Sequence, residues 1–247
     1  MESQAPSPEL PPAAALAVLE PIRPRPSFWH LLAWMAFFGS FLLVSFAPLF
    51  PPLSDGGLVV PPGILDDPSM LVIAIASSWV SLAVAAFLAW RAGLTLADVG
   101  LVRRPLGETL SWTLVLLSLL LASVVLAELL LGDRLHVVEP LTRRPSGFGH
   151  WMLWLGLSVS AGFCEEIFMR GYGIGLLRRF AVPKEVALVL TAAVFGCLHL
   201  YEGPFAVLVI AVWGLLFGYI FVRTGSLWPS ILAHFAVDAV APFFIPG

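Results

Sequence analysis

Long apolar stretches separated by short polar segments dominate the chain. A helix needs roughly 20 apolar residues to cross the hydrocarbon core of a bilayer. Seven stretches reach or approach that length, at residues 28–49, 69–90, 110–131, 150–177, 186–201, 205–222 and 227–244. The pattern predicts an all-α fold, a polytopic transmembrane helical bundle of about seven spans, or eight if one further segment enters the membrane. Because the fifth stretch is short and the fourth is long, we expect tilted spans or spans of unequal depth.

Polar, turn-rich segments connect these stretches. Pro51–Ser69 is rich in proline and acidic residues, Arg91–Glu108 is basic, and Gly132–Gly147 is polar. The first 27 residues are rich in proline and alanine and lack the apolar core of a signal peptide. We therefore expect residues 1–27 to form a disordered tail and residues 28–247 to form one transmembrane helical domain.

The composition places the protein in the membrane class. Of 247 residues, 59% are hydrophobic and only 12% are charged, and the mean hydropathy is +0.94. The charged share is about half that of a soluble domain. A formal net charge of -3 and the absence of a basic stripe argue against nucleic acid as a partner. Gly171, Gly173 and Gly175 follow no predicted strand, so they do not indicate a nucleotide-binding loop.

Basic residues near the ends of the stretches predict how the chain is oriented. If the N-terminus is cytoplasmic, most basic residues face the cytoplasm: Arg23, Arg25, Arg91, Arg103, Arg104, Arg178, Arg179, Lys184 and Arg223. Arg134, Arg143 and Arg144 then face the other side. Arginine greatly outnumbers lysine, and alanine and proline are abundant, which suggests a bacterial protein. We therefore expect an integral protein of a bacterial inner (plasma) membrane with a cytoplasmic N-terminus.

Few ionisable residues interrupt the apolar stretches. A charged side chain at the centre of a bilayer costs at least ~2.5–3.5 kcal/mol, so each such residue is a candidate functional residue. The candidates are Glu128, Glu165, Glu166, Arg170, His199, His234 and Asp238. Glu128 lies towards the end of its stretch, so we favour a position facing the bundle or solvent over a functional role.

Helical geometry separates the roles of the two adjacent glutamates. Glu166 and Arg170 are four residues apart, so they can pair on one face of a helix. Glu165 points about 100° away from Glu166, which leaves it available for another helix or for water. His234 and Asp238 are also four residues apart and share a face. We expect Glu166 and Arg170 to support the site rather than to react.

The depth of these residues in the membrane predicts a shared polar pocket. At ~1.5 Å per residue, Glu165 lies ~20 Å from Arg178, His199 ~20 Å from Val186 and His234 ~12 Å from Ser226. Such a pocket suits hydrolysis, because a buried glutamate can act as a general base towards water. Histidines can stabilise a developing oxyanion or, with a carboxylate, bind zinc. The spacing is not that of the H-E-x-x-H zinc motif.

Three short motifs resemble those of one protease family. Glu165–Arg170, "EEIFMR", is similar to its E-E-x-x-x-R motif, and Phe195–His199, "FGCLH", to its F-x-x-x-H motif. His234–Asp238, "HFAVD", is similar to its third motif, H-x-x-x-N or D. Order and spacing agree over about residues 147–240, and the chain resembles the CAAX prenyl protease and bacteriocin-processing (CPBP, or Abi) family of intramembrane proteases. The first three stretches carry no family motif.

The resemblance implies a membrane-embedded endopeptidase of the metalloprotease type, whose site opens towards the cytoplasmic leaflet. It implies that Glu165 activates the attacking water and that His199 holds this water or a metal. His234 and Asp238 would bind the oxyanion or complete a metal site, supported by Glu166 and Arg170. The candidate metal ligands are therefore His199, His234, Glu165 and Asp238. Zinc is the candidate cofactor, and we expect no other cofactor. The expected partners are membrane lipid and a peptide or membrane-protein substrate, lipidated or not, but no nucleotide.

Asp238 departs from the CAAX-type pattern, which usually has Asn at this position. An ionised Asp cannot donate a hydrogen bond to an oxyanion, so it is better suited to orient His234 or to bind a metal. Two functions of another class also remain open: a non-catalytic immunity protein and a proton-coupled transporter that uses the same acids and histidines. The lack of an internal repeat disfavours the transporter.

Overall fold

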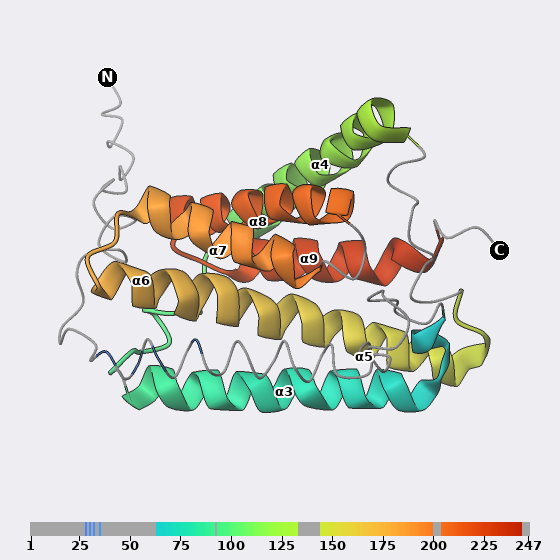
Figure 1. Ribbon diagram of the computed structural model, residues 1–247, viewed down its shortest axis with the longest axis horizontal. Coiled ribbons are helices and arrows are strands. Elements are labelled where there is room, and N and C mark those ends of the chain that lie inside the picture. The colour runs from blue at the N-terminus through green and yellow to red at the C-terminus, as the bar shows by residue number, and fades with distance from the viewer. Residues whose placement is uncertain are drawn as a thin grey trace, which may run out of the picture.

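The computed structural model describes residues 63–91, 93–132, 144–199 and 204–243, with the single positions 28, 30, 32 and 35. Helices make up all the regular structure of these residues (Figure 1). The predicted tail, residues 1–27, and most of the first predicted span, residues 28–49, lie outside the described residues. The all-α prediction is confirmed for the part of the chain that the structure describes.

Within the part of the chain that the structure describes, four helical segments are long and apolar enough to cross a membrane. They are α3 (Pro68–Arg91), α4 (Leu106–Leu131), the continuous segment Gly147–Arg179 and α8 (Pro204–Thr224). The continuous segment consists of α5 (Gly147–Glu166), the π-helix η5 (Ile167–Ile174) and α6 (Gly175–Arg179). These segments correspond to four of the predicted spans, and the protein is an integral membrane protein.

The count of seven spans is not confirmed. Residues 186–201 and 227–244 correspond to α7 (Lys184–Leu198) and α9 (Trp228–Val240), which have 15 and 13 residues. At ~1.5 Å per residue these helices are about 22 and 20 Å long, which is shorter than the ~30 Å hydrocarbon core. The apolar stretch overestimates α9 because Pro242 and its neighbours form a separate 3₁₀ turn, η7 (Ala241–Phe243).

Local chemistry determines where α3 begins. The backbone N–H and the hydroxyl of Ser69 both donate to Asp67 Oδ1 at 2.8 Å, which lowers the pKa of this exposed carboxyl. Asp67 thus acts as an N-cap, and Pro68 occupies the first helical position, where its missing N–H costs nothing.

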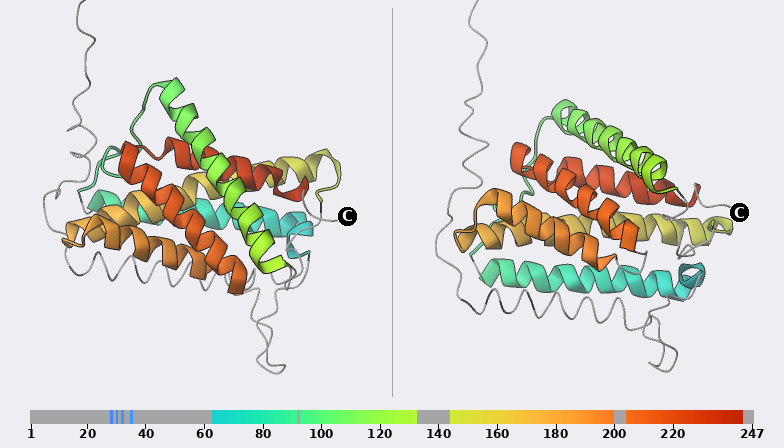
Figure 2. Two further views of the ribbon diagram at one scale, coloured as in Figure 1. Left: turned by 90° about the horizontal axis from the view of Figure 1, so that it is seen from above. Right: turned by 45° about the horizontal axis from the view of Figure 1, so that its top comes forward.

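The helices form a bundle around α5. This helix packs between α3 on one side and α9 on the other, while α7 and α8 pack together as a pair. Helix α4 packs on α8 and α9 and crosses them obliquely at the edge of the bundle (Figure 2). The exposed faces of the long helices are apolar, as on α4, where Leu129 and Leu130 are exposed.

Two glycines allow the helices that carry the polar residues to approach closely. A Cβ atom on Gly162 of α5 would lie 2.8 Å from the backbone nitrogen of Phe235 in α9. A Cβ atom on Gly196 of α7 would lie 2.5 Å from the carbonyl oxygen of Val207 in α8. Each glycine precedes a polar candidate residue by about one helical turn. The close contacts therefore hold Glu165 and His199 against neighbouring helices.

Candidate active site

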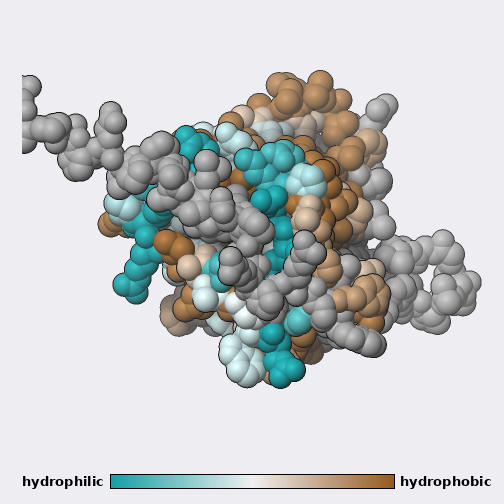
Figure 3. Space-filling view, turned by 90° about the vertical axis from the view of Figure 1, so that its left-hand side faces the viewer, coloured by the Kyte–Doolittle hydropathy of each residue, from teal (hydrophilic) through white to brown (hydrophobic). Residues whose placement is uncertain are grey.

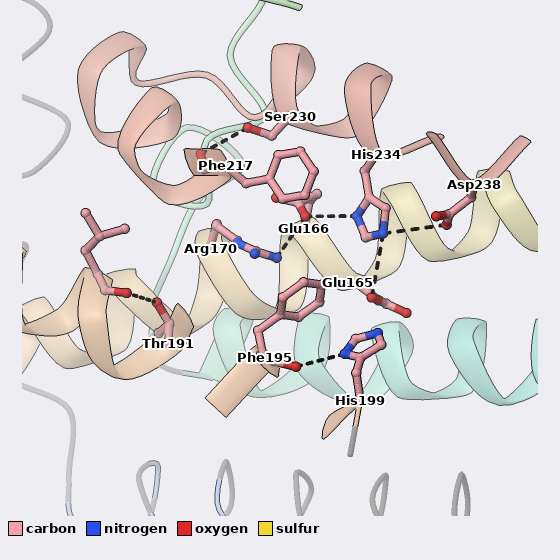
Figure 4. Close-up of polar contacts among 11 residues, drawn as sticks. Glu165, Glu166, Arg170, Thr191, Phe195, His199, Phe217, Ser230, His234 and Asp238 are labelled. Atoms are coloured by element: carbon pink, nitrogen blue, oxygen red, sulfur yellow. Dashed lines mark hydrogen bonds and ion pairs between the residues drawn. The ribbon is translucent and has the colours of Figure 1, made fainter. Parts of the chain in front are cut away.

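The candidate residues converge from three parts of the fold. Glu165 and Glu166 end α5, and Arg170 lies in η5. His199 directly follows α7, and His234 and Asp238 lie in α9. Figure 4 shows these side chains pointing towards one another between the helices.

Glu166 is the centre of the buried polar contacts. Its Oε1 accepts a hydrogen bond from Arg170 Nη1 at 2.8 Å, the pairing that their spacing predicts. The same oxygen lies 3.0 Å from Nδ1 of His234. The side chains of Glu166 and Arg170 are 0% and 1% exposed, and that of His234 is 9% exposed. One carboxylate oxygen therefore joins α5, η5 and α9 away from solvent.

Two aromatic rings surround the buried guanidinium. Cζ of Arg170 lies 4.2 Å from the centre of the Phe195 ring and 5.3 Å from that of Phe217. The face of an aromatic ring attracts a cation, by about 2 kcal/mol where both are desolvated. Phe217 also stacks on the His234 imidazole at 5.3 Å. The rings thus stabilise the charge of Arg170 and restrict the orientation of His234.

Two carboxylates that are more exposed than that of Glu166 face the other nitrogen of His234. Nε2 lies 3.6 Å from Asp238 Oδ2 and 4.0 Å from Glu165 Oε2. The Glu165 and Asp238 side chains are 25% and 30% exposed. Both distances exceed that of a good hydrogen bond, and a water molecule or a reacting group can bridge such a separation. The more exposed side of the site is therefore the one that holds Glu165, Asp238 and Nε2 of His234.

Hydrogen bonding assigns the protons on both imidazoles. Nδ1 of His199 lies 2.8 Å from the Phe195 carbonyl oxygen, which can only accept. Nδ1 therefore carries hydrogen, and in the neutral ring Nε2 has the lone pair. The same reasoning holds for Nδ1 of His234, whose partner is the carboxylate of Glu166. The hydrogen bond at Nδ1 therefore fixes the orientation of each ring.

The phenylalanine of the second motif connects the two histidines. The Phe195 ring meets His199 edge-on at 4.8 Å and His234 edge-on at 6.0 Å between ring centres. His199 and Glu165 lie opposite each other in Figure 4. The fold therefore brings all six predicted catalytic and supporting residues into one region, and Glu128 lies exposed on α4.

A metal site needs both suitable donor atoms and a suitable arrangement of them. His, Glu and Asp are suitable zinc ligands. Among the described residues, however, no group of three or more His, Cys, Asp or Glu side chains is arranged to hold a metal ion. The candidate ligands His199, His234, Glu165 and Asp238 do not fit a zinc site as placed.

Two features of the site were missed by sequence reasoning. Phe217 belongs to an apolar stretch without ionisable residues, so no sequence signal marked it. The π-helix η5 follows the paired glutamates directly, and π-turns often occur at functional sites. The glycines at positions 171, 173 and 175 were a signal for it. A Cβ atom on Gly171 would lie 2.5 Å from the Val99 carbonyl oxygen, so this position requires glycine.

Comparison with known proteins agrees with the motifs. Residues 147–240 match the family model described as type II CAAX prenyl endopeptidase Rce1-like. The matched range contains every residue of the candidate site. No curated protein and no solved structure matches the chain. The predicted resemblance is therefore confirmed over this range, and residues 147–240 carry an Rce1-like domain of the CAAX prenyl protease family.

Proposed function

We propose that the protein is an intramembrane endopeptidase in which Glu165 activates the water that attacks a peptide bond. The observation that carries this proposal is the arrangement around Nε2 of His234. Two partly exposed carboxylates, Glu165 and Asp238, face this nitrogen, while the buried carboxylate of Glu166 holds the opposite side of the ring. The Rce1-like domain supports a membrane endopeptidase in general terms.

The proposed reaction begins with proton transfer from water to the Glu165 carboxylate. His199, fixed through Nδ1, accepts a hydrogen bond from this water at Nε2 and orients it. The water oxygen forms a bond to the carbonyl carbon, and the C=O electron pair moves to the carbonyl oxygen. When Nε2 of His234 carries hydrogen, it donates to that oxyanion, a form of stabilisation that lowers the barrier.

The second half of the reaction returns the proton. The oxyanion re-forms the carbonyl, the C–N bond breaks, and Glu165 passes its proton to the leaving nitrogen. The products are a new carboxyl terminus and a new amine. Asp238, which in its ionised form cannot donate a hydrogen bond, orients His234 from the exposed side. Glu166 and Arg170 act through His234 and are positioning residues.

We further propose that the N-terminus is cytoplasmic and that the protein resides in a bacterial plasma membrane, as its basic residues and composition predict. The substrate class is a peptide or a membrane protein, with or without a prenyl group. An immunity protein or a transporter built on the same side chains would leave peptide bonds intact.

Replacing the three reactive groups one at a time tests the proposed function. We expect Glu165→Gln, His199→Ala and His234→Ala each to lower cleavage by at least about 10²-fold, a usual contribution of general acid–base groups. The measurement identifies new protein C-termini in membranes of cells that produce wild type or each variant. Termini that require all three residues would also reveal the substrate.

The matched control for that experiment is Glu185→Gln. Glu185 is an exposed glutamate at the start of α7, and its ion pair with Lys184 is largely exposed. This variant should keep the wild-type set of C-termini. If all three site variants also keep that set while reaching the membrane at normal levels, the endopeptidase proposal is wrong.

Chelation tests whether a metal takes part. We expect cleavage of a farnesylated CAAX peptide by the purified protein to survive 1,10-phenanthroline, because the described side chains do not form a three-ligand cluster. Elemental analysis of the same preparation should find less than one zinc per chain. Loss of activity on chelation, restored by added zinc, would replace the glutamate–water mechanism with a metal-dependent one.

The Glu166–Arg170 pair can be tested by separating stability from rate. Glu166→Gln leaves Arg170 buried without its counter-charge, which costs about 3–5 kcal/mol in comparable pairs. Adding Arg170→Met removes that charge, so the double variant should regain much of the thermal stability lost by Glu166→Gln. Its cleavage rate should nevertheless stay roughly 10- to 100-fold low, because His234 has lost the carboxylate that positions it. Wild-type cleavage by the double variant would contradict a positioning role.

A further inference from the structure

The helices around the site differ greatly in length, and this difference determines where the site is covered. The segment Gly147–Arg179 has 33 residues, whereas α7 and α9 have 15 and 13. Both short helices run in from the same side and carry their chemistry near their C-terminal ends. His199 directly follows α7, and Asp238 lies two residues before the end of α9. The site therefore lies where α7 and α9 stop.

The opposite side of the site is closed by tightly packed residues. All eight residues of η5 are buried, and Phe195 and Phe217 are 2% and 0% exposed. In Figure 4 Arg170 and both rings lie on one side of His234, and Asp238 lies on the other. On this side of His234 the described side chains are therefore packed and buried.

The connection between α3 and α4 adds a second layer to this closure. The Val99 carbonyl oxygen lies against Gly171 of η5. The backbone N–H of Leu227 donates to the Gly100 carbonyl at 2.9 Å, and the Ser226 hydroxyl donates to the Val102 carbonyl at 2.8 Å. We call residues 99–102 the loop seal. It joins η5 to the turn between α8 and α9 and closes this end of the bundle.

The closed end is also the basic end. Arg91, Arg178 and Arg223 lie in the last turns of α3, α6 and α8, and Lys184 begins α7. Figure 3 looks onto this end and shows hydrophilic residues gathered on it. The side-chain exposure of the site rises in the other direction, from 1% at Arg170 and 9% at His234 to 25% at Glu165 and 30% at Asp238.

We propose that water and the peptide reach Glu165 from the end of the bundle at which α5 begins, and that the loop seal bars entry from the basic end. If the basic end is cytoplasmic, as its arginines predict, the mouth of the site faces the opposite leaflet. The family resemblance implies a site that opens towards the cytoplasmic leaflet. The leaflet inferred here is the other one, and labelling can distinguish them. This inference names the access route to the site of the proposed function and rests on that function.

Labelling of single cysteines in sealed membrane vesicles tests the route without reference to the absolute orientation. The background replaces the two native cysteines, Cys164→Ala and Cys197→Ser. Ser146→Cys and Glu185→Cys, both at exposed positions, report the end where α5 begins and the basic end. Glu165→Cys reports the site. The probe is a charged, membrane-impermeant methanethiosulfonate, applied to vesicles of either orientation.

We expect Glu165→Cys to react in the vesicles in which Ser146→Cys reacts. Its rate there should be at least about tenfold higher than in vesicles that expose Glu185→Cys, because a charged reagent crosses hydrocarbon poorly. Asp238→Cys, on a different helix, should give the same result and guards against misfolding of one variant. Size-exclusion elution of each variant checks that it is folded. Reaction of both site cysteines in the vesicles that expose Glu185→Cys would overturn the proposal.

The labelling is independent of catalysis, so it separates the route from the proposed function. Labelling from the Ser146 side together with full cleavage by Glu165→Gln would leave the route standing and remove the proposed function. Labelling from the Glu185 side together with loss of cleavage in Glu165→Gln would overturn the route and leave the proposed function standing.

Discussion

The buried ion pair between Glu166 and Arg170 is the interaction on which the rest of the site depends. Its two charges are almost fully removed from solvent, and one oxygen of Glu166 serves both Arg170 at 2.8 Å and His234 at 3.0 Å. Burying a charge is tolerable only where it is paired and hydrogen-bonded. Two aromatic rings and one carboxylate meet this requirement for Arg170. Because Glu166 is committed to this pair, Glu165 is the glutamate to which we assign the proposed chemistry.

The same constraint explains the division of the site into a closed and an open half. Charges that lack water need packed neighbours, and Arg170 lies in the buried segment η5 against the rings of Phe195 and Phe217. The proposed general base needs water, and Glu165 lies where α7 and α9 have ended. The two adjacent glutamates thus differ in environment. The rotation of about 100° per residue points Glu166 into the packed half and Glu165 into the open half.

Sequence reasoning predicted the side-chain geometry within each helix better than the lengths of the helices. The four-residue spacings predicted the contacts of Glu166 with Arg170 and of His234 with Asp238, since these depend only on local helical geometry. Phe217 could not be predicted, because its role depends on how α8 packs across η5 and α9. The apolar stretch 227–244 also overestimated α9, because hydropathy does not reveal where a helix ends. The π-helix had a weak signal in its glycines.

The central claim is that Glu165, His199 and His234 act as one catalytic unit. The most direct test compares cleavage of a farnesylated CAAX peptide by the single variants Glu165→Gln, His199→Ala and His234→Ala with that by the triple variant. Groups that work on one transition state are strongly non-additive, and removing all of them costs little more than removing the most important one. The account predicts a triple variant within about tenfold of the slowest single variant. Losses that multiply across the three positions would show that the residues act independently and would contradict it.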